Sequence, residues 1–319
     1  MAALSNRDLA PNPFLLPQGA YAQLDCLLGS RFIAEDLSLS SVKPARSLLA
    51  GSVRTRYRGR GMDFEEVRLY QAGDDIRSID WRVTARTQVP HTKLYREERE
   101  RPVFLLVDQR ASMFFGSRRC FKSVLACYIA ATLGWTALGN SDRIGALVFG
   151  DSDQRDIRAR RGKHAQLELI HQLQEFNRRL TSPIASEHSL SLAELLADLR
   201  RISKPGSALF IISDFRDMDE ACERELFSLA RHADLTLIHV YDPLEQQLDS
   251  NQPLSVSNGQ VRVQLPAQQR SFQQAYRALF ERRLELLTQT AKRLGIALLS
   301  LSTQDDCAQQ LRQTFGRRR

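Results

Sequence analysis

Four apolar segments of the sequence are each closed by an acidic residue, and these acids are the first candidates for chemistry. They are Asp108, Asp151, Asp214 and Asp242. The segments before them have the length and the β-rich composition of strands that are buried on both faces. Because the carboxyl ends of parallel strands meet at one edge of a sheet, where ligands bind, we expect several of these carboxylates to lie close together.

Two interpretations of this acidic edge fit the sequence. Carboxylate and hydroxyl oxygens are the ligands that Mg²⁺ prefers, and Ser112, four residues after Asp108, offers a hydroxyl. Alternatively, Asp is a common turn and helix-capping residue after any strand. Asp108 and Asp214 are the pair for which we favour the chemical interpretation.

The motifs of common enzyme classes are absent from the sequence. Ser112 lies in no Gly-x-Ser-x-Gly motif, and no Gly-x-x-x-x-Gly-Lys-Ser/Thr loop occurs that would hold the phosphates of ATP. The residues after Asp108 do not form the Asp-x-Asp pair of aspartyl phosphoryl transfer. We therefore expect a non-enzymatic protein with no catalytic residue. The alternative is a Mg²⁺-dependent hydrolase of phosphate esters that uses the strand-end carboxylates.

The composition indicates a chain with a sizeable core and an excess of positive charge. The 319 residues include 45 Lys and Arg against 37 Asp and Glu, and 43% of all residues are hydrophobic. Two Arg clusters, at residues 54–60 and 155–161, suggest nucleic-acid binding as a third function. Apart from Tyr57 these clusters contain no interleaved aromatic residue, so we do not expect nucleic acid as a partner.

The sequence also bears on the compartment. No apolar stretch approaches the roughly 18 residues that cross a bilayer, and residues 1–18 lack the basic start and apolar middle of a signal peptide. The five cysteines are scattered, with no Cys-x-x-Cys spacing. Free thiols are typical of a reducing compartment. We therefore expect a cytoplasmic protein with no membrane span.

The elements that must position the acids alternate between strands and helices. Residues 103–107, 144–149, 207–213, 235–241 and 296–301 read as strands, and residues 121–138, 164–176, 190–202, 220–231 and 267–294 read as helices. This alternation predicts an α/β fold with a mainly parallel sheet. Residues 250–265 interrupt it as a predicted β-hairpin, because Asn258-Gly259 suits a type I′ turn.

The chain divides into three predicted parts. Residues 1–100 form an N-terminal extension, residues 101–304 form the α/β domain, and residues 305–319 form a C-terminal helix and basic tail. The small β-hairpin at about residues 250–265 is an insertion in the α/β domain.

The densest charged stretch, residues 59–101, ends the extension. Its notable members are Glu65, Glu66, Arg68, Asp74, Asp75, Arg77, Asp80, Trp81, Arg82 and Arg86. Asp74 or Asp75 is predicted to cap a helix that turns Ile76 inward together with Ile79 and Val83. We expect these charges to pair with one another and Trp81 to anchor the packing. Alternatively, the Arg and Trp side chains contact a partner protein.

The stretch from residue 61 to residue 101, followed by the Asp108 strand, resembles the bacterial DUF58 family, whose members carry a von Willebrand factor A-like domain. The similar pieces are Asp-Phe-Glu-Glu-Val-Arg at residues 63–68, Gly-Asp-Asp-Ile-Arg at residues 73–77, Ile-Asp-Trp-Arg at residues 79–82 and Thr-Ala-Arg-Thr at residues 84–87. The resemblance implies a von Willebrand A-like (Rossmann-like) sheet of mainly parallel strands with helices on both faces. It also implies a MoxR-type AAA+ ATPase and other von Willebrand A-like proteins as partners.

The resemblance further implies a metal site of the MIDAS type, which is altered in this chain. Such sites use Asp-x-Ser-x-Ser after the first strand, a Thr on a later loop and an Asp after a further strand. Asp108, Ser112 and Asp214 match the outer positions, whereas Arg110 stands at the middle Ser and no Thr occurs near residues 189–191. We expect Arg110 to pair with the carboxylates in the place of a cation. Alternatively, Arg110 points away and Asp108, Ser112 and Asp214 hold Mg²⁺.

These inferences lead to one leading hypothesis. The chain is a protein-interaction module, an adaptor or partner of a MoxR-type ATPase in the assembly or maturation of protein complexes. A partner carboxylate would complete the metal site or, where Arg110 replaces the metal, pair with its guanidinium.

Overall fold

The computed structural model describes residues 16–39, 62–71, 74–97, 101–179, 190–248, 250–257 and 262–316, with backbone alone for residues 62–66 and 93–97. The chain separates into two compact units, with divisions after Val42 and after Glu100. Residues 16–39 and 101–316 belong to the larger unit, and residues 62–97 belong to the smaller one.

A six-stranded sheet with the order β10-β7-β6-β3-β4-β5 forms the centre of the larger unit. Its strands are β3 (Pro102–Asp108), β4 (Arg143–Phe149), β5 (Gln154–Arg160), β6 (Ala208–Ser213), β7 (Asp234–Tyr241) and β10 (Ala297–Ser302). Each pair of neighbours is parallel except β4 and β5, which are antiparallel. The α/β fold with a mainly parallel sheet that we expected is therefore confirmed.

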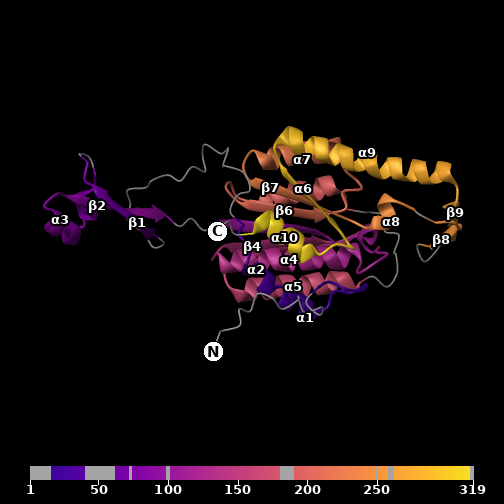
Figure 1. Ribbon diagram of the computed structural model, residues 1–319, viewed down its shortest axis with the longest axis horizontal. Helices are drawn as coiled ribbons and strands as arrows, with labels where there is room; N and C mark the ends of the chain where they lie inside the picture. The colour runs from indigo at the N-terminus through magenta and orange to yellow at the C-terminus, as the bar shows by residue number, and fades with distance from the viewer. Residues whose placement is uncertain are drawn as a thin grey trace, which may run out of the picture. The chain divides into compact units, whose positions relative to one another are not determined.

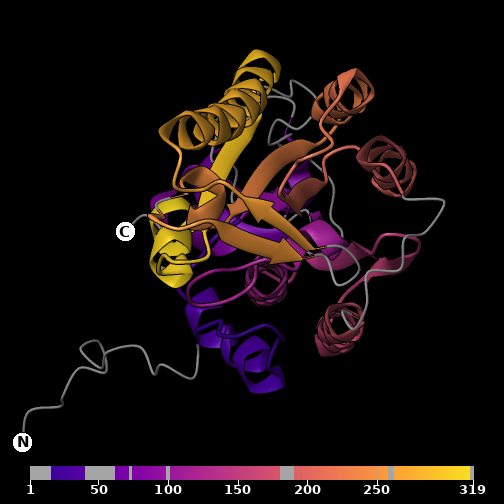
Figure 2. The same cartoon turned by 90° about the vertical axis from the view of Figure 1, so that its right-hand side faces the viewer.

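Helices cover both faces of this sheet (Figure 1). One face packs on α4 (Lys122–Gly139) and α5 (Lys163–Arg178), and the other packs on α6 (Leu192–Ile202), α7 (Glu220–Ala230) and α9 (Arg270–Leu294). Figure 2 shows the same two layers from another direction. Side chains of β3 alternate between the two cores, with Leu105 in one and Leu106 in the other, which explains the unbroken apolar run.

The arginine cluster that begins at Arg155 is an exception to the sequence interpretation. The sequence pattern assigned it to no strand, whereas in the structure it lies in the antiparallel edge strand β5. Only Ile157 of β5 is fully buried, whereas the arginines point mostly to solvent. Charged side chains on an edge strand oppose pairing with further strands, so this basic run has a structural explanation.

The two ends of the chain contribute short helices to the larger unit. Helices α1 (Leu24–Gly29) and α2 (Arg31–Ala34) pack on α4, where the Trp135 indole donates a hydrogen bond of 3.0 Å to the Leu27 carbonyl. Helix α10 (Cys307–Phe315) places Phe315 in the same core. The predicted extension of residues 1–100 is therefore not one piece, because residues 16–39 pack with the α/β unit.

The smaller unit is an antiparallel pair of strands with a short helix. Strand β1 (Met62–Leu69) pairs with β2 (His91–Glu97), and α3 (Trp81–Thr87) lies between them in sequence. The single helix predicted after Asp74 or Asp75 is wrong, because a 3-10 turn at Ile76–Ser78 and then α3 form instead. Consequently Ile76 is exposed rather than turned inward.

A helix-and-hairpin excursion follows β7. Helix α8 (Pro243–Gln246) leads to the antiparallel strands β8 (Leu254–Ser257) and β9 (Arg262–Leu265), so the hairpin insertion forms, although the predicted Asn258-Gly259 turn lies outside the described residues. In the part of the chain that the structure describes, no helix combines the length and the apolarity that a membrane crossing needs. The five cysteines are free and buried.

Candidate functional site

Four neighbouring parallel strands place their terminal acids along one edge of the sheet, which we call the rim. In spatial order the acids are Asp242 after β7, Asp214 after β6, Asp108 at the end of β3 and Asp151 after β4. The rim forms as the sequence predicted because the strands run parallel and in register. Each carboxylate is bonded to different cations or hydrogen-bond donors, and these contacts determine whether the rim can hold a metal ion or a partner.

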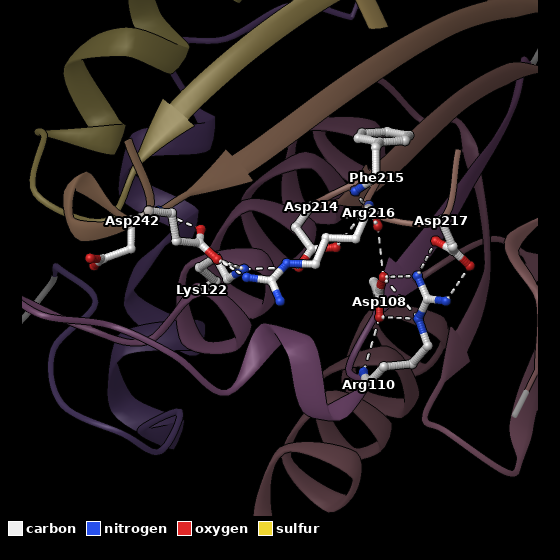
Figure 3. A network of polar contacts seen from close by, with 10 residues as sticks. Asp108, Arg110, Lys122, Asp214, Phe215, Arg216, Asp217 and Asp242 are labelled. Carbon is white, nitrogen blue, oxygen red and sulfur yellow. Dashed lines mark hydrogen bonds and ion pairs between the residues drawn. The ribbon is translucent and has the colours of Figure 1, made fainter. Parts of the chain in front are cut away.

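Asp108 is fully buried, and its partner is Arg110 (Figure 3). The guanidinium donates from Nη2 to Asp108 Oδ2 at 2.7 Å and from Nε to Oδ1 at 3.1 Å. On its other side it donates from Nη1 and Nη2 to the two oxygens of Asp217, at 2.6 and 3.0 Å. A planar guanidinium is thus clamped between two carboxylates in a fork geometry that Lys could not reproduce.

Asp214 carries a different cation. The Nζ atom of Lys122 lies 2.8 Å from Asp214 Oδ2 and 2.8 Å from Glu245 Oε1. Arg216 adds a second cation to the same two carboxylates, with its Nε 3.3 Å from Asp214 Oδ2. The hydroxyl of Ser112 also hydrogen-bonds to Asp214. We expected Arg110 to bridge Asp108 and Asp214, whereas it bridges Asp108 and Asp217.

The electrostatics of the rim follow from these contacts. Burial by itself would raise the pKa of Asp214, but Lys122, Arg216 and the hydrogen bond from Ser112 outweigh it and lower that pKa. Burial raises the pKa of Asp108, against the opposing effects of Arg110 and of the hydrogen bond from Ser213. The pKa of Arg110 is raised, because its two carboxylates outweigh the effect of burial.

The residues present do not fit the Mg²⁺ that the resemblance implies. A cation at this position would need the oxygens of Asp108 and Asp214, and these are bonded to Arg110 and Lys122. Among the residues that the structure describes, no group of three His, Cys, Asp or Glu side chains has a metal-binding arrangement. The positive charge at the rim is therefore supplied by protein side chains.

The other two acids of the rim have structural roles. Asp242 accepts hydrogen bonds from the backbone and hydroxyl of Ser117, at 2.8 and 2.5 Å, and from the Thr303 hydroxyl at 2.5 Å. It also caps α8, so the capping interpretation is correct for this acid. Asp151 accepts a hydrogen bond of 2.9 Å from the backbone of Ala111 and thereby fixes the loop after β3.

Sequence reasoning missed four residues of the rim, namely Lys122, Arg216, Asp217 and Glu245. Lys122 begins the apolar helix α4, and one lysine at the start of an otherwise apolar helix was the available signal. Asp217 accepts a hydrogen bond of 3.1 Å from the Leu192 backbone and so joins the rim to α6. No spacing rule could find it, because its partner Arg110 lies 107 residues away in the chain.

The charged stretch of the smaller unit contains an ion pair and two caps among its described side chains. Arg68 pairs with Asp74 at 2.8 Å, and Asp75 and Asp80 cap the 3-10 turn and α3. Exposed members of the stretch are Arg77, Arg82 and Arg86, whereas Glu65 and Glu66 lie in β1 with side chains outside the described residues. Trp81 is 66% exposed, so it is not packed among the described residues of the smaller unit.

Similarity to known proteins shows the family to which this chain belongs. The family described as "Protein of unknown function DUF58" matches residues 66–302 of the chain. The chain belongs to the DUF58 family. The matched part of this DUF58 chain begins in β1 and ends with β10, so it spans the smaller unit and the whole rim.

Sequence relatives of the DUF58 chain occur in mycobacteria. It is 31% identical over 266 residues to "Uncharacterized protein Rv1480" of Mycobacterium tuberculosis, a match that covers 82% of this chain and 81% of that protein. An uncharacterized protein of Mycobacterium bovis gives the same identity and coverage.

Two solved structures that are similar to the DUF58 chain are a conserved hypothetical protein and a protein domain described as a VWA domain. The conserved hypothetical protein BatB from Bacteroides thetaiotaomicron matches with a TM-score of 0.43 and 13% identity, over 67% of this chain and 96% of that one. The SpRpn10 VWA domain matches with a TM-score of 0.33 and 12% identity, over 67% of this chain and 94% of that one.

Proposed function

We propose that this DUF58 chain is a non-enzymatic interaction module that binds a partner protein at the rim without a divalent cation. The observation that carries the proposal is the substitution of charges at the rim. Arg110 is bonded to Asp108, and Lys122 is bonded to Asp214. In this proposal the rim acidic residues stand where a metal-dependent site would have them, and Arg110 and Lys122 supply the positive charge that a bound cation would otherwise supply.

The outer part of the rim offers groups that a partner can contact. The side chain of Arg216 is 46% exposed and that of Asp217 is 37% exposed, although each is also bonded inward. Their inner partners hold both side chains in place, so a partner would meet a preorganised cation and a preorganised anion. Such preorganisation lowers the entropic cost of binding.

Among the residues that the structure describes, no catalytic group can be assigned, which supports a non-enzymatic role. Burial raises the pKa of the thiols of Cys26, Cys120 and Cys222 to about 12, which makes them poor nucleophiles at neutral pH. Burial lowers the pKa of His239 to about 4, and its ring is enclosed by aromatic residues. A Mg²⁺-dependent hydrolase would need the oxygens that Arg110 and Lys122 already use.

The partner in this proposal is a MoxR-type AAA+ ATPase, for which the chain serves as an adaptor in the assembly or maturation of protein complexes. The support is membership of the DUF58 family, with which such ATPases are associated. The working compartment in the proposal is the cytoplasm, because five free cysteines are most compatible with a reducing environment.

Affinity capture tests the proposal. The tagged full chain is incubated with the native lysate, with Mg²⁺ and ATP present throughout so that any ATPase keeps its own nucleotide. The wild type is compared with Arg216→Glu at the rim and with Arg200→Glu as the matched control. Arg200 is also half-exposed and paired with an acid, Glu225, but it lies at the end of α6 opposite the rim.

The expected result is that wild type and Arg200→Glu recover an AAA+ ATPase, identified by mass spectrometry, and that Arg216→Glu recovers much less. Recovery by all three proteins alike would remove the rim from the proposal. Failure of the wild type to recover any ATPase would contradict the adaptor role.

A further inference from the structure

A cavity of about 300 Å³ adjoins the rim on the side of α9. Its buried lining combines the aromatic and apolar side chains of Phe215, His239 and Leu287 with the carboxylate of Asp214, and Glu245 also lines it. Its exposed lining includes Arg216 and Arg283. A concave surface that combines apolar side chains with a few placed polar groups is the usual form of a recognition pocket. We call it the α9 pocket.

The backbone at Phe215 connects this pocket to the rim. Phe215 has φ of 50°, a left-handed conformation that is costly for an aromatic residue, and its backbone N–H donates to Ser213 Oγ at 3.1 Å. The turn sends the side chains of Asp214 and Arg216 into the ion pairs of the rim, whereas the Phe215 ring points away from Asp108 and Arg110 (Figure 3). One strained residue thus builds the pocket wall beside the charged rim.

The aromatic part of the pocket is uncharged at neutral pH. His239 stacks on Tyr241 with ring centroids 5.5 Å apart and lies 6.2 Å from the ring of Phe280. The packing of these rings, together with the burial that lowers the pKa of His239, leaves an aromatic surface that suits a large apolar side chain.

The margin of the pocket carries two cations, Arg216 and Arg283, with different surroundings. Arg216 is matched by Asp214 and Glu245. Arg283 has no acidic partner among the residues that the structure describes. Burial raises the pKa of Tyr276, which also lines the pocket, and Arg283 acts on that pKa in the opposite direction. An unmatched guanidinium next to an apolar cavity is complementary to a carboxylate on the occupant.

The apolar surface also continues along α9. Leu279 lines the pocket and is 55% exposed, and Leu286, seven residues further on, is exposed on the same face of the helix. A bound chain could therefore enter the pocket and continue along α9, which favours an internal segment of a partner over a chain terminus.

We propose that the α9 pocket binds an internal segment of a partner protein in which a large aromatic side chain is next to an acidic residue. The aromatic ring occupies the cavity against Phe215 and Phe280, and the carboxylate pairs with Arg283. This inference rests on the proposed function, since it names the feature by which a partner at the rim is recognised.

Capped peptides test the pocket directly on the full chain. The probes are acetyl-Gly-Asp-Phe-Gly-amide, its Asn analogue without the charge, and its Ala analogue without the ring, titrated by ligand-observed NMR. The Asp-Phe peptide is expected to bind roughly five times or more tighter than either analogue, since an ion pair at a partly desolvated site contributes about 1 kcal/mol. Arg283→Gln abolishes the advantage over the Asn analogue, while Arg282→Gln, an exposed neighbour outside the pocket, keeps it.

Three results would overturn this inference. One is the absence of saturable binding by the Asp-Phe peptide, and another is an unchanged preference in Arg283→Gln. The third is binding of acetyl-phenylalanine with a free carboxylate but not of the capped peptide, which would assign the pocket to a chain terminus. If any of these occurs while ATPase capture still depends on Arg216, the pocket inference fails and the proposed function stands. If the peptides bind as expected and no ATPase is captured, the pocket inference stands and the proposed ATPase partner is contradicted.

Discussion

Lys122 Nζ lies 2.8 Å from Asp214 Oδ2, and both side chains are almost completely removed from solvent. The lysine comes from the first turn of α4 and the aspartate follows β6, so the ion pair joins a helix to the end of a central strand. A buried pair of this kind is costly to desolvate, and its loss is costlier still when one charge remains behind. The ion pair is therefore a buried structural part of the rim rather than an exposed surface ion pair.

Lys122→Met is expected to lower the free energy of unfolding by about 3–5 kcal/mol, because it leaves Asp214 and Glu245 buried without their shared cation. Urea unfolding followed by circular dichroism measures the change. The double variant Lys122→Met with Asp214→Asn removes both charges and should recover part of the loss. A single variant as stable as the wild type would show that Arg216 alone balances these carboxylates.

Mg²⁺ is expected to leave the melting temperature of the wild type unchanged, since a ligand stabilises a protein only when it binds the folded state, and the oxygens it needs are bonded to Arg110 and Lys122. Thermal melting at increasing Mg²⁺ concentration, with matched ionic strength, measures this. Arg110→Ser is the comparison, because it exposes the carboxylates of Asp108 and Asp217 and is the variant that Mg²⁺ would stabilise. Saturable stabilisation of the wild type would contradict a cation-independent rim.

The strand-end carboxylates of the larger unit were predictable because local composition determines them. A buried parallel strand must be apolar on both faces, so Asp108 and Asp214 stand out as the points where each strand reaches the edge. The cation that pairs with Asp214 could not be predicted in the same way, since Lys122 is separated from Asp214 by 92 residues and from Glu245 by 123. Such pairs are set by strand order, which sequence periodicity does not contain.

In the smaller unit, apolar spacing led to a wrong prediction of local structure. Ile76, Ile79 and Val83 have helical spacing, but Asp80 caps a new helix at Trp81, and the backbone N–H groups of Arg82 and Val83 donate to it at 3.0 and 3.2 Å. A local capping preference thus divided a stretch that apolar spacing alone joined into one helix. This division also changes which side chains share a face of the helix, and Trp81 is exposed at the start of α3.

Trp81→Phe is expected to change the free energy of unfolding by less than about 0.5 kcal/mol, because an exposed side chain contributes little packing. It should also remove the tryptophan fluorescence that acrylamide quenches readily. The remaining Trp135 is partly buried and hydrogen-bonded to Leu27, so it should be quenched slowly. Strong destabilisation, or quenching that is unchanged by the substitution, would place Trp81 in a packed interior after all.

His239 makes the stability of the chain depend on pH in a range where few groups titrate. Burial lowers its pKa from 6.5 to about 4, so between these values the unfolded chain binds a proton that the folded chain does not. Stability therefore falls as the pH is lowered through this window and is fully present above it. From pH 7 to pH 5 the expected loss is about 2 kcal/mol from this residue, measured by urea unfolding at each pH.

His239→Phe separates this effect from the titration of the rim. Phe keeps an aromatic ring between Tyr241 and Phe280 but binds no proton, so the variant should lose the part of the pH dependence that lies between pH 7 and pH 5. Asp214 and Asp242 also have lowered pKa values, but their contribution is lost only at lower pH, as the carboxylates become protonated. A variant whose stability still falls by the wild-type amount between pH 7 and pH 5 would assign that loss to other groups.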